Sequence, residues 1–196
     1  MRDAQIEDIA RAVGINRAIV YRHFTGKEEL FALTLVGYLD ELRVELEAAA
    51  APLPNRTVAA RLTTTIEAFV RYGVAYPAFA DCAQSLMRRT GPELLDELSE
   101  SALLRLGRGM SGCLAILTTL FDEGNAAGEF EVAEPALLAN MLYATGLGTL
   151  QLARVGILVT ETAPGVPSVA PISADQVRDH LVSAALGQAS RIATTP

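Results

Sequence analysis

The chain has 196 residues, of which 51% are hydrophobic and 20% charged, so it can bury a sizeable core and is not a disordered segment. Its formal net charge of −7 excludes general adhesion to nucleic acid or to an anionic membrane, although it leaves room for a local basic face. Alanine and leucine dominate and tryptophan is absent, a composition that favours helix.

Membrane and metal functions find no support in the sequence. No apolar run reaches the ~18 residues that a membrane-spanning helix requires, and charged residues interrupt the N-terminal segment, so no signal peptide is indicated. The two cysteines, Cys82 and Cys113, form no CxxC pair, and no His/Cys cluster has metal-ligand spacing. We therefore expect buried, reduced thiols in a cytoplasmic protein that holds no metal and no cofactor.

The first predicted elements are two short helices. Residues 6–13, "IEDIARAV", place apolar side chains at i, i+3, i+4 and i+7, which form one face of a helix. Gly14 suits the end of that helix, and Asn16 is a good N-cap for a second helix that runs to about Phe24. Two short helices joined by a three- or four-residue turn with glycine form a helix-turn-helix.

The remainder of the chain is also predicted to be helical. Thr25 and Glu28 have the spacing of a capping box, which opens a long helix that Pro52 ends. The glycine- and proline-rich segment 156–172 is predicted to be a loop, and no strand is predicted. A second capping box, at residues 173–176, opens the last helix. The other predicted helices cover residues 57–76, 78–90, 92–124 and 135–155.

The second short helix carries positive charge only. From Asn16 to Lys27 the charged residues are Arg17, Arg22 and Lys27, a net charge of +3 without an acid. Arginine pairs bidentately with guanine or phosphate, and a helix-turn-helix places its second helix in the major groove of DNA. A short basic helix on an acidic protein can alternatively be a solvated face, with Tyr21 in the core.

The segment "IEDIARAVGINRAIVYRHFTGKEELF" resembles the DNA-binding signature of the tetracycline-repressor (TetR) family of one-component regulators over about 26 residues. The Tyr-x-x-Phe pair and the "KEEL" exit stand in the family's order and spacing. The resemblance implies that this helix touches bases and phosphates and that Lys27 holds a backbone phosphate. The implied DNA-binding residues are Asn16, Arg17, Ala18, Ile19, Tyr21, Arg22, His23 and Lys27.

Two departures from the family pattern matter. Ile19 stands where the family usually has threonine, so a thymine methyl contact could replace a polar one. The family has a further helix before this signature, whereas this sequence starts five residues before its first predicted helix. We expect that the start was assigned downstream of the true one or that the chain was shortened. The alternative is a helical ligand-binding dimer with an impaired DNA-binding head.

The resemblance also implies the organisation of the whole chain. It implies an all-α protein with a DNA-binding region over residues 1–29 and a helical ligand-binding and dimerisation domain over residues 30–196. Gly146, Gly148 and Thr149 would let a second helix approach closely, although an ordinary core helix could also contain them. We expect a homodimer through residues 135–155 and 174–192 that binds a double-stranded, pseudo-palindromic operator.

The expected effector is a small, apolar molecule that releases a repressor from its operator. Ordinary core packing is the alternative role for each candidate pocket residue. An enzyme is not expected, because the two histidines lie 157 residues apart and there is no Ser/His/Asp set or Gly-rich phosphate loop. The candidate ligand-binding residues are Phe69, Tyr72, Phe79, Cys82, Met87, Met110, Cys113, Leu117 and Tyr143.

Overall fold

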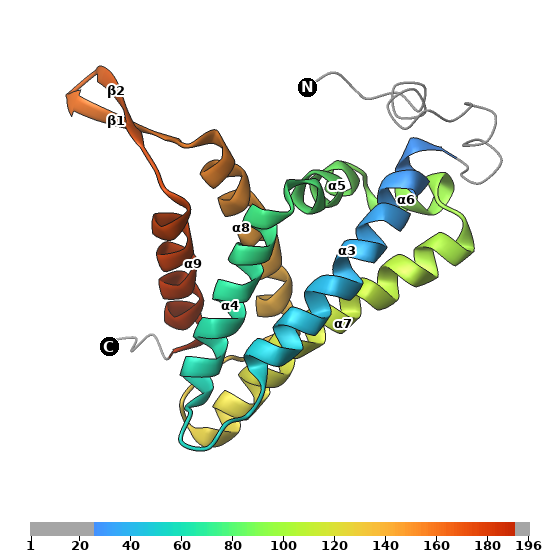
Figure 1. Cartoon of the computed structure of the whole chain (residues 1–196), viewed down its shortest axis with the longest axis horizontal. Coiled ribbons are helices and arrows are strands. Elements are labelled where there is room, and N and C mark those ends of the chain that lie inside the picture. The colour runs from blue at the N-terminus through green and yellow to red at the C-terminus, as the bar shows by residue number, and fades with distance from the viewer. Residues whose placement is uncertain (1–25, 191–196) are drawn as a thin grey trace.

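The computed structural model describes residues 26–190, and in that part of the chain seven helices and one two-stranded sheet form the fold. The predicted all-α class is confirmed, and the predicted helix-turn-helix at residues 6–24 lies outside the described residues. The elements are α3 (Lys27–Ala50), α4 (Val58–Ala75), α5 (Pro77–Met87), α6 (Gly91–Glu97), α7 (Glu100–Ala127), α8 (Pro135–Val155), β1 (Ile157–Ala163), β2 (Val166–Pro171) and α9 (Ala174–Ala189) (Figure 1).

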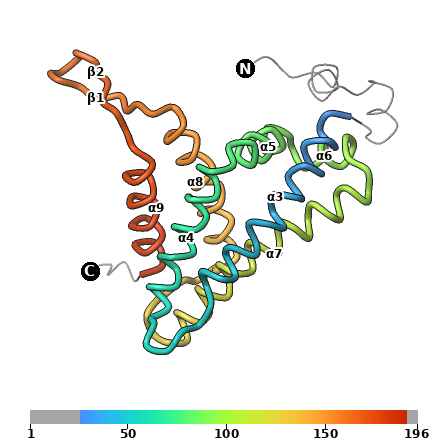
Figure 2. Tube along the Cα trace, viewed as in Figure 1, coloured from blue at the N-terminus to red at the C-terminus, as the bar shows by residue number. Residues whose placement is uncertain are grey.

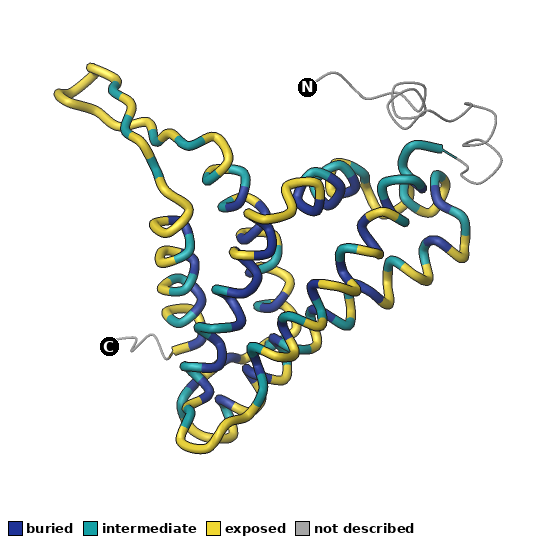
Figure 3. The backbone as a smooth tube through the Cα atoms, in the orientation of Figure 1, coloured by how far each residue is buried: buried dark blue, intermediate teal, exposed yellow. Residues whose placement is uncertain are grey.

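The helices share one apolar core. Helices α3 and α7 run side by side along most of their length, α4 packs on both, and α8 and α9 cover the far side of α4 (Figure 2). Apolar residues of α3 recur every three or four positions, so they form one buried face. The largest fully buried side chains are Tyr72, Phe79 and Phe121. The tube coloured by exposure shows buried residues along the inward faces of the helices (Figure 3).

Several helix ends follow the local signals in the sequence. The Thr57 hydroxyl accepts a hydrogen bond from the Ala60 amide at 3.1 Å and begins α4. Ser173 and Gln176 form the predicted capping box of α9. Gly128 and Gly156 take φ angles of 72° and 74°, which favour glycine, and end α7 and α8.

The predicted helix over residues 92–124 is wrong, because the structure has two helices there. Leu98 is extended, and the Ser99 side chain caps α7 by accepting from the Ala102 amide at 3.3 Å. The second helix also continues to Ala127. Gly124 stays helical beneath the ring of Phe130, where a Cβ would lie 2.0 Å from a ring carbon.

The predicted loop over residues 156–172 and the prediction of no strand are also wrong. Strands β1 and β2 pair in antiparallel register as a hairpin, with Val159 opposite Val169. The Pro164–Gly165 pair, with Gly165 at φ 78°, suits the turn between them. Prolines in β2 are tolerated because a two-stranded sheet has only edge strands.

The predicted capping box at Thr25 and Glu28 lies partly outside the described residues, so it stays a prediction. Gly26 is the N-cap of α3 and no side chain caps this helix, while Thr25 lies outside the described residues. The Glu28 carboxylate instead accepts a hydrogen bond from Arg89 at 2.5 Å. The Glu28 side chain, which the sequence predicted to cap α3, therefore forms an ion pair with Arg89.

Candidate functional site

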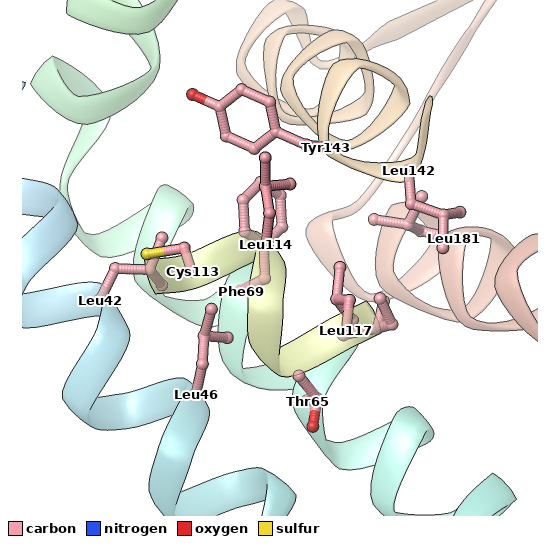
Figure 4. A pocket seen from close by; sticks show the side chains of 11 residues that line it. Leu42, Leu46, Thr65, Phe69, Cys113, Leu114, Leu117, Leu142, Tyr143 and Leu181 are labelled. Carbon is pink, nitrogen blue, oxygen red and sulfur yellow. The ribbon is translucent and has the colours of Figure 1, made fainter. Parts of the chain in front are cut away.

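A narrow apolar cavity of about 30 Å³ lies where α3, α4, α7, α8 and α9 meet (Figure 4). None of the lining residues carries a charge. Burial of apolar surface is therefore the main free energy that this cavity offers to a ligand. The lining residues are Leu42, Leu46, Thr65, Ile66, Phe69, Cys113, Leu114, Leu117, Leu142, Tyr143 and Leu181.

The cavity has three polar side chains, and two of them are bonded to the backbone. The Thr65 hydroxyl donates to the Arg61 carbonyl at 2.8 Å, and the Cys113 thiol donates to the Leu39 carbonyl at 3.4 Å. The Tyr143 hydroxyl has no hydrogen-bond partner among residues 26–190, and in Figure 4 it lies at the opposite end of the lining from Thr65. The cavity therefore offers a ligand one hydroxyl donor at its end.

Burial keeps the acidic groups of the cavity protonated. Desolvation raises the pKa of the Cys113 thiol to about 12, and it also raises the pKa of the Tyr143 phenol. At neutral pH neither group carries a charge. The lining is thus suited to a neutral, apolar ligand surface.

Phe69 connects this cavity to the aromatic core. Its ring packs edge-on against Phe79, with centroids 6.0 Å apart, and against Tyr143, with centroids 6.3 Å apart. Helix α8 can lie against the ring because Gly146 has no side chain: a Cβ there would lie 2.6 Å from Phe69 Cε1. Gly146 thus allows close packing between α8 and α4 within one protomer.

Four of the nine predicted ligand-binding residues line the cavity, namely Phe69, Cys113, Leu117 and Tyr143. Met87 is 56% exposed, and Met110 is half-buried beside the core. The other three are buried without lining the cavity; they are Tyr72, Phe79 and Cys82.

The sequence reasoning missed the contribution of α3. Leu42 and Leu46 line the cavity from a helix whose leucines looked like ordinary core positions. Thr65 and Ile66 were also missed, although they lie four and three positions before Phe69 and so share its helix face. That spacing was the available signal for α4, whereas no local signal distinguished the leucines of α3.

Polar contacts tie the first turn of α3 to the α5–α7 region. Arg89 contacts Glu28 at 2.5 Å and Glu97 at 3.2 Å. The Ser99 hydroxyl, which caps α7, also donates to Glu29, whose side chain belongs to a residue that is only 4% exposed. This turn follows the predicted recognition helix directly, so the contacts connect that part of the chain to the helical body.

Among the predicted DNA-binding residues, only Lys27 lies in the described part of the chain. Its ammonium is 3.9 Å from the carboxylate of Glu28, at the start of α3. The remaining predicted DNA contacts lie outside the described residues; they are Asn16, Arg17, Ala18, Ile19, Tyr21, Arg22 and His23.

The outer face of α8 is exposed and uncharged. Its residues recur every three or four positions, and a Cβ added to Gly148 on this face would meet no atom within 4 Å. Gly187 on α9 is open in the same way. A second helix could therefore approach both positions closely. The residues of the α8 face are Leu137, Met141, Ala144, Gly148, Leu152 and Val155.

Two functional classes receive no support from residues 26–190. No helix in this range is both long enough and apolar enough to span a bilayer. In the same range, no three His, Cys, Asp or Glu side chains come together in a group that could bind a metal ion.

Comparison with known proteins links the N-terminal sequence to a family. Residues 1–34 match the sequence model described as "Bacterial regulatory proteins, tetR family". This match covers the predicted helix-turn-helix and the first turns of α3. No curated protein sequence matches the chain.

Solved structures share the fold over nearly the whole chain. A bacterial regulatory protein in the tetR family from Rhodococcus RHA1 aligns with TM-score 0.68 and 17% identity, covering 95% of this chain and 86% of that chain. FadR from Bacillus subtilis, solved in complex with stearoyl-CoA, aligns with TM-score 0.64 and 14% identity, covering 94% and 88%. KstR2 of Mycobacterium tuberculosis, a ketosteroid transcriptional regulator, aligns with TM-score 0.64 and 19% identity, covering 97% and 86%.

The fold is therefore the helical fold of these solved transcriptional regulators. Residues 1–34 match the tetR-family sequence model, and the described part of the chain has the fold of solved tetR-family regulators.

Proposed function

We propose that the protein is a dimeric, ligand-responsive repressor that leaves a pseudo-palindromic operator when an apolar effector enters the central cavity. The observation that carries this proposal is the uncharged cavity of the helical body, because α3 lines this cavity and its first turns belong to the matched N-terminal sequence. Residues 1–29 would bind DNA, and residues 30–196 would bind the effector and form the dimer. Operator binding would put the protein in the cytoplasm.

The lining of the cavity supports an effector with a large apolar part and one polar group. The lining offers no cation to bind an anionic group, and Tyr143 offers a single hydroxyl donor to a carbonyl or hydroxyl oxygen. Two proteins of the same fold agree with this chemistry, since one was solved with stearoyl-CoA and the other is a ketosteroid regulator. The proposed effectors are therefore acyl compounds or polycyclic compounds with a polar end.

The exposed faces of α8 and α9 support the proposed dimer. The α8 face is apolar or small throughout, and the open positions at Gly148 and Gly187 permit close helix packing. The proposed interface comprises residues 135–155 and 174–192, of which residues 191 and 192 lie outside the described part. A two-fold axis there would present two recognition helices to two operator half-sites.

The proposed response is a shift between two arrangements of the helices. Helix α7 lines the cavity and its cap Ser99 bonds to Glu29 of α3, so the ligand and the DNA-binding region share a structural element. An effector shifts the equilibrium only by its differential affinity for the two arrangements. The effector-bound arrangement would no longer match the spacing of the half-sites.

DNA binding tests this proposal. Fluorescence anisotropy would measure the affinity of the full chain for duplexes that flank its own gene, over a series of salt concentrations. Each phosphate contact adds roughly 0.9 to the slope of log affinity against log salt. The addition of stearoyl-CoA or a ketosteroid should release the duplex. A folded dimer that prefers no duplex at low salt would contradict the proposal and favour a ligand-binding dimer with an impaired head.

Substitutions separate the proposed DNA contacts. Lys27→Ala should weaken binding to all duplexes alike, whereas Arg17→Ala or Arg22→Ala should change sequence preference where the arginine reads a base. Arg71→Ala is the matched control, because Arg71 is an exposed cation on α4 that pairs with Glu45 at 3.0 Å. Equal losses for all three head variants would contradict base readout.

A further inference from the structure

The hairpin 157–171 exposes its apolar face. On one face Val159 and Val169 stand opposite each other and are 79% and 66% exposed. The other face carries Thr160 opposite Ser168. The face that carries the two valines, which we call the valine face, is apolar except for Glu161, and its register pairs are Ile157–Pro171, Val159–Val169 and Glu161–Pro167.

This arrangement leaves the valine face without a covering layer in the described part of the chain. A two-stranded hairpin is marginally stable in water by itself, and exposed apolar strands are prone to association. The hairpin extends away from the helices (Figures 1 and 3), so its own protomer provides little cover there. The valine face is thus suited to contact another molecule.

The connections of the hairpin point to a second copy of this chain. It joins α8 directly to α9, and the Ile172 amide closes its base by donating to the Gly156 carbonyl at 3.1 Å. The outer face of α8 ends at Leu152 and Val155, and Ile157 continues this exposed apolar series into β1. The hairpin therefore continues the apolar surface that the proposed dimer uses.

The length and charge of the hairpin fit the same occupant. Strands of seven and six residues span about 20 Å at ~3.3 Å per residue, whereas packed helices lie about 8–10 Å apart. An arm of this length can cross a two-fold interface and reach the helices of the other protomer. Its only charged residue is Glu161, so it lacks the cations that would attract nucleic acid or an anionic membrane.

We propose that the hairpin is a dimerisation arm whose valine face packs on a second copy of this chain. The arm rests on the proposed α8/α9 dimer and adds a contact outside those two helices. Because of the two-fold symmetry, each dimer would contain two such contacts.

Dimer dissociation tests the arm directly. Sedimentation experiments on the full chain over a dilution series would give the dimer Kd of the wild type, Val159→Asp and Val169→Asp. Each substitution buries a carboxylate twice per dimer, so we expect Kd to rise on the order of 100-fold. Thr160→Asp is the matched control on the opposite face and should change Kd less than about threefold. Circular dichroism should show unchanged helix content, because these side chains are exposed.

A variant of the α8 face separates failure of the arm from failure of the dimer. Met141→Arg, at a position that is 57% exposed, should dissociate the dimer if α8 forms the interface. If Met141→Arg dissociates the dimer and the two valine variants keep the wild-type Kd, the proposed dimerisation arm is wrong, whereas the proposed α8/α9 dimer is retained. A wild type that is monomeric throughout the dilution series would overturn both.

Cross-linking offers a second readout that does not depend on affinity. A benzophenone maleimide would label Val169→Cys selectively, because the native Cys82 and Cys113 are buried. Irradiation should then give a covalent dimer, with a lower yield from the same label at Thr160→Cys. Cross-links formed only within one chain would overturn the arm.

Discussion

Replacing Gly146 by alanine should push the Phe69 ring toward the cavity. The new Cβ would lie 2.6 Å from Phe69 Cε1 and 3.1 Å from Cζ, whereas ordinary contact begins at 3.4 Å, so the ring must move by about 0.8 Å. Its edge contacts with Phe79 and Tyr143 restrict the other directions. Overpacking of this kind costs about 1–3 kcal/mol, while alanine gains about 1 kcal/mol over glycine in a helix. The net loss of unfolding free energy should be about 0–2 kcal/mol.

Gly107→Ala is the matched control for this prediction. Gly107 lies within α7, and a Cβ there would meet no atom within 4 Å. It should therefore gain about 0.5–1 kcal/mol from helix propensity alone. Urea unfolding followed by circular dichroism, at one fixed protein concentration, would measure both variants. A parallel titration with an apolar fluorescent dye should show weaker binding to Gly146→Ala only.

The comparison between the two variants isolates the contact. If Gly146→Ala stabilises the protein as much as Gly107→Ala and leaves dye affinity unchanged, Phe69 does not pack against α8 as described. If Gly146→Ala loses stability but binds the dye as well as the wild type, Phe69 does pack against α8, and the ligand binds away from the Phe69 side of the cavity.

Three further predictions follow from the site. Tyr143→Phe should weaken an effector that carries a carbonyl or hydroxyl group about 5–10-fold, as one lost hydrogen bond implies, and leave a plain hydrocarbon unaffected; calorimetry would measure both. Burial raises the pKa of Cys82 to about 11 and the pKa of Cys113 to about 12. The unfolded chain therefore loses these two protons at lower pH than the folded chain, so the free energy of unfolding should fall as the pH rises above 9. Urea unfolding at several pH values would test the sign of this change. Lys27 is the only lysine in the sequence, so endoproteinase Lys-C can cut the chain once. Arg89→Ala should speed this cleavage because Glu28, next to Lys27, loses its ion pair with Arg89. Arg71→Ala, which removes an ion pair with Glu45 elsewhere, should leave the cleavage rate unchanged.

The helices could be predicted because their signals are local. Apolar periodicity indicated α4 and α8, and the capping box at Ser173 and Gln176 gave the start of α9. The break between α6 and α7 could not be found in this way. The helical pattern continues through Ser99, and the hydroxyl that caps α7 also bonds to Glu29, 70 positions earlier in the chain.

The hairpin shows a different limit. Its glycine and prolines indicate irregular structure, yet Gly165 serves the turn and the prolines of β2 occupy edge positions. Part of the cavity lining could be predicted because some of its residues are of a distinctive type. Phe69 and Tyr143 stand out as aromatic residues, whereas the leucines of α3 acquire their role only when α3 packs beside α7.

Helix α7 gives the proposed response a physical basis. Its residue Cys113 lines the cavity 14 positions after the cap Ser99, a distance of about 21 Å along a helix at ~1.5 Å per residue. A helix transmits displacement along its axis, and Ser99 contacts a carboxylate on the first turn of α3. Because Glu29 is buried, loss of this hydrogen bond would cost more free energy than loss of a solvent-exposed one, so α3 should follow Ser99 rather than part from it. An effector that displaces α7 would therefore act on the turn that follows the proposed DNA-binding sequence.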